Sequence, residues 1–521
     1  MPSRPRLRAE LQLTLRPDGA SGEILDPLFS RHVGLGAVGV ALAQSLDGTR
    51  TLPEVLGDLV ARGLPRAKVE ASLRSLLLLH LVEGIGDDVR ARVHSLRAGE
   101  VQLDYQALPA ARFACQSSSQ CCRSYRLGPV QPDEEQRLLA LPLRERMPDL
   151  PEGELFVRRG DPGEEQIFFR TVGARCVFLR PNLHCGLHAS FGEAYKPSTC
   201  RFYPLEVQVT FEGARVYDKG HCASHFVSQV EGPELITTAR LLRPRFDGNT
   251  PLFHPIVFLR EDTPVDFSHF LVLEAALREA VAKDDPLQGL ARVVAIYDSF
   301  VERVRSLPVD TEDLVDPAQV IEAWRAGLDT LVVPSSAPDW PLLIEMLEQI
   351  AYELTDYLGE AHARQGEDRD MAPLASQALP IVNYLYHRAV AASGQEGASL
   401  DPLVESAAPS AEDFAGALRR SLTSHFYGRL ALPDDRPGVA IGVAAIATAA
   451  AFVGAQRVAA AEARPYRTAD LSQGHMLAMR PLMTFAATMF RNTAERVRAL
   501  VGALPALVKW QSPAQSGNLA P

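Results

Sequence analysis

Cysteine is missing from most of this chain. The 521 residues contain 7 cysteines, and all of them lie between Cys115 and Cys222. Thiols that serve only as small core residues would be scattered over every domain, whereas clustered thiols indicate a disulfide framework or a metal site. The distribution therefore predicts one chemically specialised region within a larger protein.

We do not expect a secretory signal in the N-terminal sequence. The three arginines between residues 4 and 8 are not followed by an apolar stretch, because leucines alternate with polar residues from Leu11 to Leu15. We therefore expect a cytoplasmic protein in a reducing compartment, where disulfides are rare. The odd number of thiols indicates the same, so the cysteines favour metal binding over a disulfide framework.

The chain has fewer positively than negatively charged residues. There are 53 Lys and Arg residues against 64 Asp and Glu residues, which gives a net charge of −11. Proteins that bind nucleic acids usually carry an excess of positive charge. The charge balance therefore argues against a nucleic-acid partner, and a hydrophobic share of 46% is typical of a soluble globular protein.

Only one stretch is apolar enough to need comparison with a membrane helix. Residues 438–455 contain no charge, and Gly438 and Gly442 have the spacing of a membrane helix pair. However, 11 of these 18 residues are Ala or Gly, which provide little hydrophobic drive for insertion. We therefore predict a closely packed, buried helix and no membrane contact.

The chain is predicted to be mainly α-helical, with a small α+β cysteine region. Residues 1–30 are expected to be irregular, with one short edge strand, and residues 31–95 to form a small helical domain. Within that domain, a turn at Asp47-Gly48 separates two helices and a third helix spans Lys68–Leu79. A short wing strand is predicted at His80–Gly84.

This order of elements resembles the PqqD-like winged-helix fold. The resemblance depends on the run Leu46-Asp47-Gly48-Thr49-Arg50-Thr51 and on Leu81-Val82-Glu83. Domains of that family commonly bind a peptide or protein substrate and present it to a partner enzyme. The resemblance therefore implies a protein or peptide partner.

A glycine motif in the same domain is not expected to bind a dinucleotide. Gly34, Gly36 and Gly39 satisfy the G-x-G-x-x-G pattern of Rossmann folds. The preceding residues, 26–32, make a poor buried parallel strand, and no βαβ repeat follows. We interpret the glycines as the lead-in to a small helix.

The remaining chain divides into a cysteine region at 100–230, a helical domain at 232–510 and a disordered tail at 511–521. In the cysteine region, we expect a helix to begin at Pro132, with the acids after it capping its N-terminus, and short strands within residues 154–172. The helices predicted for the helical domain span residues 266–283, 286–306, 317–331, 340–358, 373–393, 411–425, 438–463 and 470–502.

All seven cysteines are candidate metal ligands. One loop contains Cys115, Cys121 and Cys122; a second segment contains Cys176, Cys185 and Cys200; Cys222 follows. Four thiolates bind zinc tetrahedrally or hold an iron–sulfur cluster, and the spacing does not choose between the two.

Polar residues beside the thiols are expected to surround the metal and not to bind it. This group consists of His184, His188, His221, His225, Arg201 and Tyr203. With seven thiols available, the imidazoles are not needed as ligands. Their expected role is packing and hydrogen bonding around the centre, which would tune its properties.

The cysteine pattern is similar to that of the YkgJ family of cysteine-cluster proteins. The family signature is C-x-x-C-x-x-C-C, followed by C-x-F/L-L, a further cysteine, and C-R-x-F/Y-P. Here the second part appears as Cys176-Val177-Phe178-Leu179 and Cys200-Arg201-Phe202-Tyr203-Pro204. Within that family, the run from Gly192 to Pro204 looks most like FliB, the flagellin lysine N-methylase.

The chain departs from the family at two points. Ser118 stands where the signature has its second cysteine, so the first loop supplies at most three thiols. Either Cys185 or Cys222 would make up the deficit. In addition, the PqqD-like block is not a feature of FliB, so the substrate need not be flagellin.

The resemblance implies a metal-bearing protein that methylates lysine side chains with S-adenosylmethionine. An iron–sulfur cluster, with four irons favoured, and zinc are both compatible with it. The residues themselves identify the metal site but no methyl-donor pocket. Two alternatives therefore stay open: a non-catalytic protein stapled by zinc or iron, and a thiol redox switch. The sequence does not indicate an oligomeric state.

Overall fold

The structure of the chain is a computed structural model. It describes residues 3–508 apart from the following positions: 18, 30, 102–103, 125–127, 162, 164, 174, 211, 240–255, 261–262, 284, 307–316, 334–337, 364–371, 411, 431–435, 480–489 and 491–493. The tail predicted at 511–521 lies outside the described residues.

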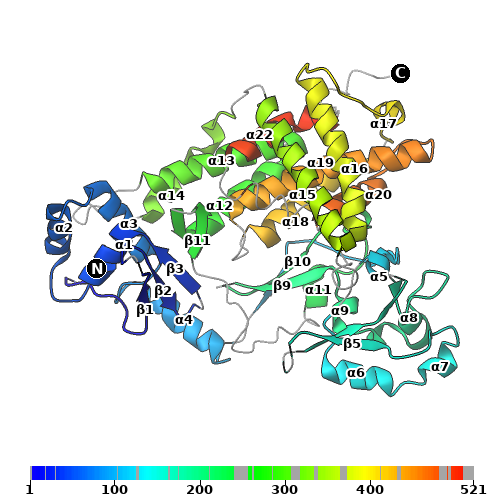
Figure 1. Cartoon of the computed structure of the whole chain (residues 1–521), viewed down its shortest axis with the longest axis horizontal. Coiled ribbons are helices and arrows are strands. Elements are labelled where there is room, and N and C mark those ends of the chain that lie inside the picture. Colours follow the sequence, from blue (N-terminus) through cyan, green and yellow to red (C-terminus); the bar gives the residue numbers. More distant parts are fainter. Residues whose placement is uncertain are drawn as a thin grey trace.

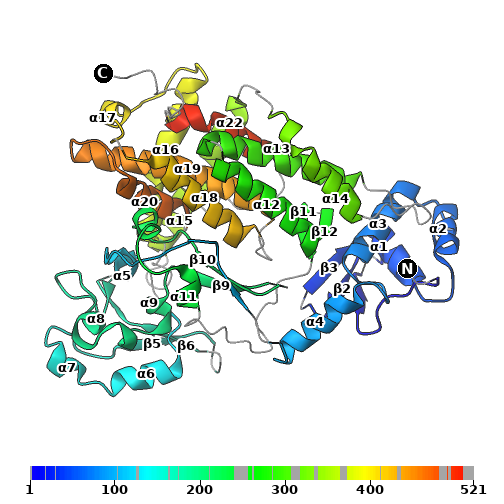
Figure 2. The same ribbon diagram turned by 180° about the vertical axis from the view of Figure 1, so that it is seen from behind.

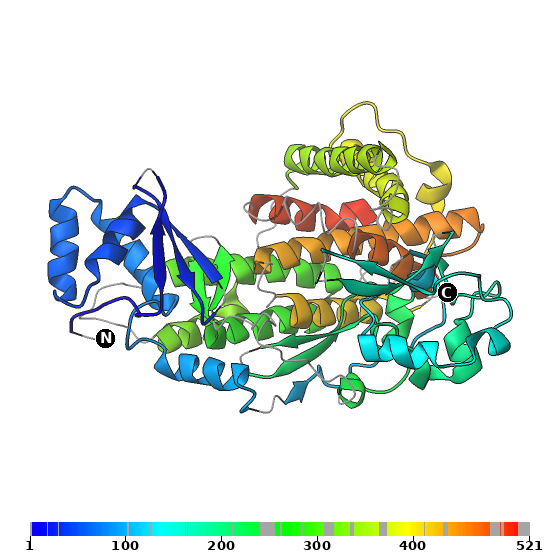
Figure 3. The same ribbon diagram turned by 60° about the horizontal axis from the view of Figure 1, so that its bottom comes forward.

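The described part of the chain is mainly α-helical, as predicted, and has three regions (Figure 1). A small N-terminal module and the cysteine region lie at opposite ends of a large helical region. The same arrangement is visible after rotation of the molecule (Figure 3).

The N-terminal module begins with a three-stranded antiparallel sheet in the order β1-β2-β3. Its strands are β1 (Gln12–Leu15), β2 (Gly22–Asp26) and β3 (Arg31–Leu35). The expected edge strand is β1, but the expectation of an otherwise irregular segment is wrong over β2. This strand places Asp26 in the interior, where Arg8 and Arg31 form ion pairs with it. A charged residue at a buried position interrupts the apolar pattern by which a buried strand is predicted.

Four helices follow the sheet. They are α1 (Ala37–Ser45), α2 (Leu52–Ala61), α3 (Arg66–Leu78) and α4 (Asp87–Arg97). The predicted wing strand appears as a single antiparallel bridge between Leu7 and Val82. Because β1 to β3 are all antiparallel, the glycines at 34–39 are not part of a βαβ unit. The winged-helix assignment stays a prediction.

The cysteine region consists of short elements. They are β4 (Tyr105–Gln106), α5 (Gln120–Ser124), α6 (Pro132–Leu139), α7 (Leu143–Arg146), β5 (Phe156–Arg159), β6 (Gln166–Phe169), β7 (Thr171–Val172), β8 (Arg175–Cys176), α8 (Gly186–Phe191), η1 (Glu193–Tyr195), α9 (Ser198–Arg201), β9 (Leu205–Val209), β10 (Ala214–Asp218), α10 (His225–Ser228) and α11 (Leu235–Ala239). The hairpin β5–β6 lies within the predicted strand segment. The sheet β4-β10-β9 was not predicted.

The helical region begins with a hairpin and continues with helices that mostly agree with the predicted spans. Its elements are β11 (Ile256–Arg260), β12 (Thr263–Asp266), α12 (Phe267–Lys283), α13 (Pro286–Arg305), α14 (Pro317–Ala326), η2 (Leu328–Thr330), α15 (Trp340–Ala363), α16 (Ala372–Ala392), α17 (Pro402–Ser406), α18 (Phe414–Arg429), α19 (Pro437–Ala461), α20 (Thr468–Leu477) and α22 (Ala494–Val508). The last predicted helix, 470–502, falls partly outside the described residues.

Helix α19 is the centre of this region. Among the described residues it alone is long and apolar enough to cross a membrane, yet 94% of its most apolar window is buried, as in a core helix of a soluble protein. Its glycines allow close packing: a Cβ atom on Gly454 would lie 2.7 Å from the Cα atom of Gly474 in α20. The predicted buried helix is confirmed.

Two junctions join the regions. At one end, Ile256 of β11 is buried in the apolar core of the N-terminal module, and Arg74 donates a hydrogen bond to the Arg305 carbonyl at 3.0 Å. At the other end, Arg215 of β10 forms a buried ion pair with Glu274 of α12 at 2.6 Å. Figure 2 shows β9 and β10 alongside the helices at this second junction.

Candidate metal centre

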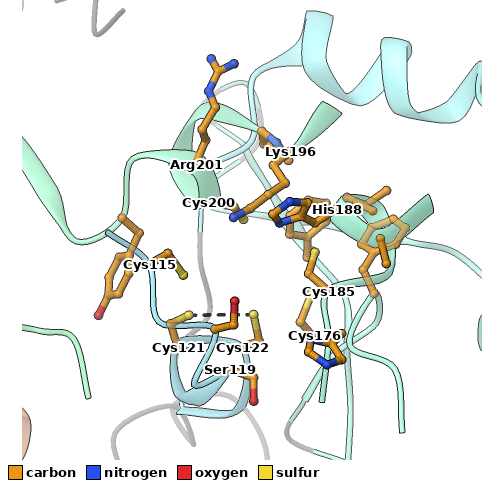
Figure 4. A pocket seen from close by; sticks show the side chains of 18 of the residues that line it. Cys115, Ser119, Cys121, Cys122, Cys176, Cys185, His188, Lys196, Cys200 and Arg201 are labelled. Carbon is orange, nitrogen blue, oxygen red and sulfur yellow. Dashed lines mark hydrogen bonds between the residues drawn. The ribbon is translucent and has the colours of Figure 1, made fainter. Parts of the chain in front are cut away.

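Six of the seven cysteines line one cavity of about 250 Å³ (Figure 4). They come from segments up to 85 residues apart, namely Cys115, Cys121, Cys122, Cys176, Cys185 and Cys200. The predicted loop half and second half of the site therefore meet at one place in the fold.

The backbone conformation determines the shape of the first half of the site, the loop from Cys115 to Cys122. Ser117 and Ser119 have left-handed φ angles of 53° and 55°, which turn the chain tightly between Cys115 and the short helix α5. Helix α5 contains both Cys121 and Cys122, and their Sγ atoms lie 3.9 Å apart.

The start of the loop is held by the end of α10 and by the segment that follows it. The Ala114 N–H donates to the Ser228 carbonyl at 3.0 Å. Gly232 makes the close approach of the two segments possible, because a Cβ atom there would lie 2.5 Å from the Phe113 carbonyl oxygen.

The second half is built from a hairpin and two short helices. Cys176 ends β8 and pairs with Thr171 of β7, and Cys185 is the N-cap residue of α8. Cys200 lies in α9. Glu134 connects α6 to α9, since its Oε1 accepts a hydrogen bond from the Ser198 N–H at 2.8 Å.

Glu134 also caps its own helix, because its side chain accepts a hydrogen bond from the Gln131 N–H at 3.2 Å. Capping by the acids after Pro132 is therefore confirmed for this residue.

The cavity lies where two apolar cores meet. Cys176, Cys185 and Cys200 pack against the core of the cysteine region. By contrast, Cys121 and Tyr203 pack against the core of the helical region. The thiols can therefore be brought together only when both regions are folded.

Cys222 lies outside the cavity lining. Its sulfur accepts a hydrogen bond from the Ser224 N–H at 3.3 Å and lies 4.0 Å from the Ser228 hydroxyl oxygen. Of the two cysteines that remained open from the sequence, Cys185 reaches the cavity and Cys222 is engaged in a local turn.

The histidines of the cysteine region also divide into those that line the cavity and those that lie outside it. His184 and His188 line the cavity, whereas His225 is buried elsewhere. The Nδ1 of His225 lies 2.8 Å from the Asp218 carboxylate, and its Nε2 lies 2.8 Å from the Ser421 hydroxyl in α18. This cluster joins the cysteine region to the helical region.

His221 contributes through its backbone. Its carbonyl accepts a hydrogen bond from the Tyr203 hydroxyl at 2.9 Å, which ties the Cys200 segment to the Cys222 segment.

Burial favours the neutral form of three thiols of the site, Cys121, Cys176 and Cys200, in the absence of a cation. It raises the pKa of Cys176 to about 12, and it raises the pKa of Cys200 well above its ordinary value, with the neighbouring Cys176 and Cys185 adding to the effect. The hydrogen bond with Cys122, followed by burial, raises the pKa of Cys121. A bound metal ion supplies the positive charge that ionises such thiols.

The cavity is lined by sulfur atoms, which are the donor type of a thiolate-bound metal, but these atoms are not gathered around one point. Within the ranges described above, no three Cys, His, Asp or Glu side chains are grouped closely enough to hold one ion. The Cys121–Cys122 separation of 3.9 Å is near the roughly 3.8 Å between two sulfurs on tetrahedral zinc, taking Zn–S bonds of about 2.3 Å. The other side chains would have to turn toward the ion.

The sequence did not single out Lys196, which also lines the cavity. The sequence feature that could have identified Lys196 is its position within the run from Gly192 to Pro204, directly before Pro197. Arg201 and Tyr203 line the cavity as well, beside Cys200, where the sequence placed them.

Comparison with known proteins gives no match to this chain among family models, curated proteins or solved structures. The resemblance to the YkgJ family and to flagellin lysine N-methylase therefore stays a prediction.

Proposed function

We propose that the thiol-lined cavity holds a metal centre and that the protein is a protein-modifying enzyme similar to lysine N-methylase. The observation that carries this proposal is the convergence of six thiols, from two separate segments, on one cavity. An iron–sulfur cluster is favoured over zinc. Such a cluster supplies one-electron chemistry, and zinc would supply Lewis-acid chemistry.

The space beside the thiols favours an enzyme over a metal staple. Structural zinc sites are closed by four protein ligands, whereas catalytic sites keep an open position. The cavity of about 250 Å³ is bordered by thiols and also by Lys196, Arg201 and Tyr203. A metal that only stapled the chain would not need this space.

The sheets of the described residues restrict where S-adenosylmethionine could bind. They have two or three strands each, and the one parallel pairing joins β4 and β10 over two residue pairs. Such sheets provide no Rossmann-type donor pocket. In this proposal, the methyl donor therefore binds in the thiol cavity, beside the metal.

The N-terminal module would hold the protein or peptide substrate. It lies at the far end of the helical region from the cysteine region, which contains the thiol cavity (Figure 3). A substrate held there would be modified at a residue far from the bound segment, because the module and the cavity do not adjoin.

The proposal is tested by metal and sulfide analysis of the full chain purified without oxygen. We expect a brown protein with roughly four irons, as one four-iron cluster holds. Cys200→Ser should lose most of the metal, because Cys200 lines the cavity.

Cys222→Ser is the matched control and should keep its metal, because Cys222 lies outside the cavity lining. Full metal retention in Cys200→Ser would contradict the ligand assignment. A colourless protein that holds one zinc and does not bind S-adenosylmethionine would instead support the non-catalytic alternative.

A further inference from the structure

The thiol cavity has an unusual charge for this protein. Its lining includes Lys196 and Arg201, together with His184 and His188, but no Asp or Glu among the described residues. The chain as a whole has a net charge of −11. A cavity that collects cations in an acidic protein is suited to an anionic ligand.

The two cations lack carboxylate partners within the part of the chain that the structure describes. Arg201 stacks over the Phe202 ring, with its guanidinium carbon 4.7 Å from the ring centroid, and its Nε is buried without a hydrogen-bond partner. The carboxylate of Glu134, which contacts the start of α9, accepts hydrogen bonds from the backbone N–H groups of Ser198 and Gln131. By contrast, the buried Arg215 pairs with Glu274.

Lys196 and Arg201 occupy different parts of the site (Figure 4). Lys196 lies beside Cys200, near the thiols, where it would also balance the negative charge of a metal–thiolate centre. Arg201 points away from Cys121 and Cys122, so its guanidinium is not held against this pair of thiols.

We infer that Arg201, supported by Lys196, forms an anion subsite at the rim of the thiol cavity. The group it takes is a carboxylate or a phosphate, which the planar guanidinium fork binds through two parallel hydrogen bonds. The inference rests on the proposed function in one respect: if S-adenosylmethionine binds in the thiol cavity, the anion is its amino-acid carboxylate. This contact would orient the donor toward the metal.

The subsite is tested by calorimetric binding to the anaerobically prepared full chain. Three probes separate the sources of the anion: S-adenosylhomocysteine, 5′-methylthioadenosine, which lacks the carboxylate, and inorganic phosphate. We expect Arg201→Gln to weaken S-adenosylhomocysteine about tenfold, which corresponds to ~1.4 kcal/mol. Lys196→Gln should weaken it less, and 5′-methylthioadenosine should bind both variants as it binds the wild type.

Two exposed cations in the N-terminal module serve as charge-matched controls, Arg16→Gln and Lys68→Gln, and neither should change binding. Metal content is measured for every variant. Phosphate binding that is lost in Arg201→Gln, without binding of S-adenosylhomocysteine, would support the subsite and count against the methyl donor.

Equal affinity of wild type and Arg201→Gln for the two anionic probes, or no binding of either, would overturn the subsite. Neither result would bear on the metal centre, whose own test is the metal content of Cys200→Ser.

Discussion

The helical region and the cysteine region become ordered in different ways. The helical region has helices of up to 25 residues around α19, whose apolar surface is almost fully buried. In the cysteine region the longest helix, among the described residues, has 8 residues. The first region is therefore stabilised mainly by apolar burial, and the second depends more on individual hydrogen bonds.

The largest effect is expected where the two regions join. Glu274→Leu leaves the guanidinium of Arg215 buried without its carboxylate, and loss of one partner from a buried pair costs about 4 kcal/mol. We therefore expect a loss of that size in the free energy of unfolding, measured by urea denaturation. It would show that the regions unfold together.

Two further variants sharpen this test. Arg215→Met combined with Glu274→Leu should recover most of the lost stability, because no buried charge is left unpaired. Glu279→Leu, at an exposed position of the same helix, should change stability little. A small effect of Glu274→Leu alone would mean that the junction does not couple the two regions.

A smaller effect is expected inside the helical region. Gly474→Ala places a Cβ atom 2.0 Å from the Ala450 carbonyl oxygen of α19, and this overpacking should cost about 2 kcal/mol. The measurement is thermal unfolding followed by circular dichroism at a helix band.

Gly502→Ala is the control for the glycine replacement. The space around Gly502 in α22 is open, so that alanine should stabilise the helix by up to about 1 kcal/mol. Equal behaviour of the two variants would show that packing between α19 and α20 does not limit stability.

The smallest effect on stability is expected in the cysteine region. Glu134→Gln places an amide group where the carboxylate accepts two backbone N–H groups, which should cost about 1.5 kcal/mol. Because the Ser198 contact holds α9, the variant should also bind less metal per chain. Asp133→Asn, on an exposed residue of the same turn, should keep both properties.

A full metal complement in Glu134→Gln would mean that α9 does not need this hydrogen bond. The cysteine region would then be less dependent on single contacts than its short elements indicate.

Apolar periodicity allowed the helical region to be predicted from sequence. The span predicted at 286–306 is α13, Pro286–Arg305, and the uncharged stretch at 438–455 lies within α19. The sheet formed by β9 and β10 was not predicted, although Leu205 and Val207 of β9 alternate with polar residues, because a strand of five residues shows too few periods to stand out in the sequence.

Clustering of the thiols was visible in the sequence, but their surroundings were not. That Cys121 faces the helical core while Cys200 faces the core of the cysteine region depends on how separate segments pack. The same holds for Lys196, whose position beside Cys200 is set by the fold. Local spacing contains no information on such contacts.

The central position of α19 has a consequence for synthesis on the ribosome. About 215 residues separate Cys222 from Pro437, and translation at about 5–20 residues per second takes roughly 10–40 s to add them. During that interval all seven cysteines have been made, but the helical core against which Cys121 packs still lacks its central helix. The nascent chain therefore leaves Cys121 without its packing partners, and under the proposed function this interval is when we expect a metal to be loaded.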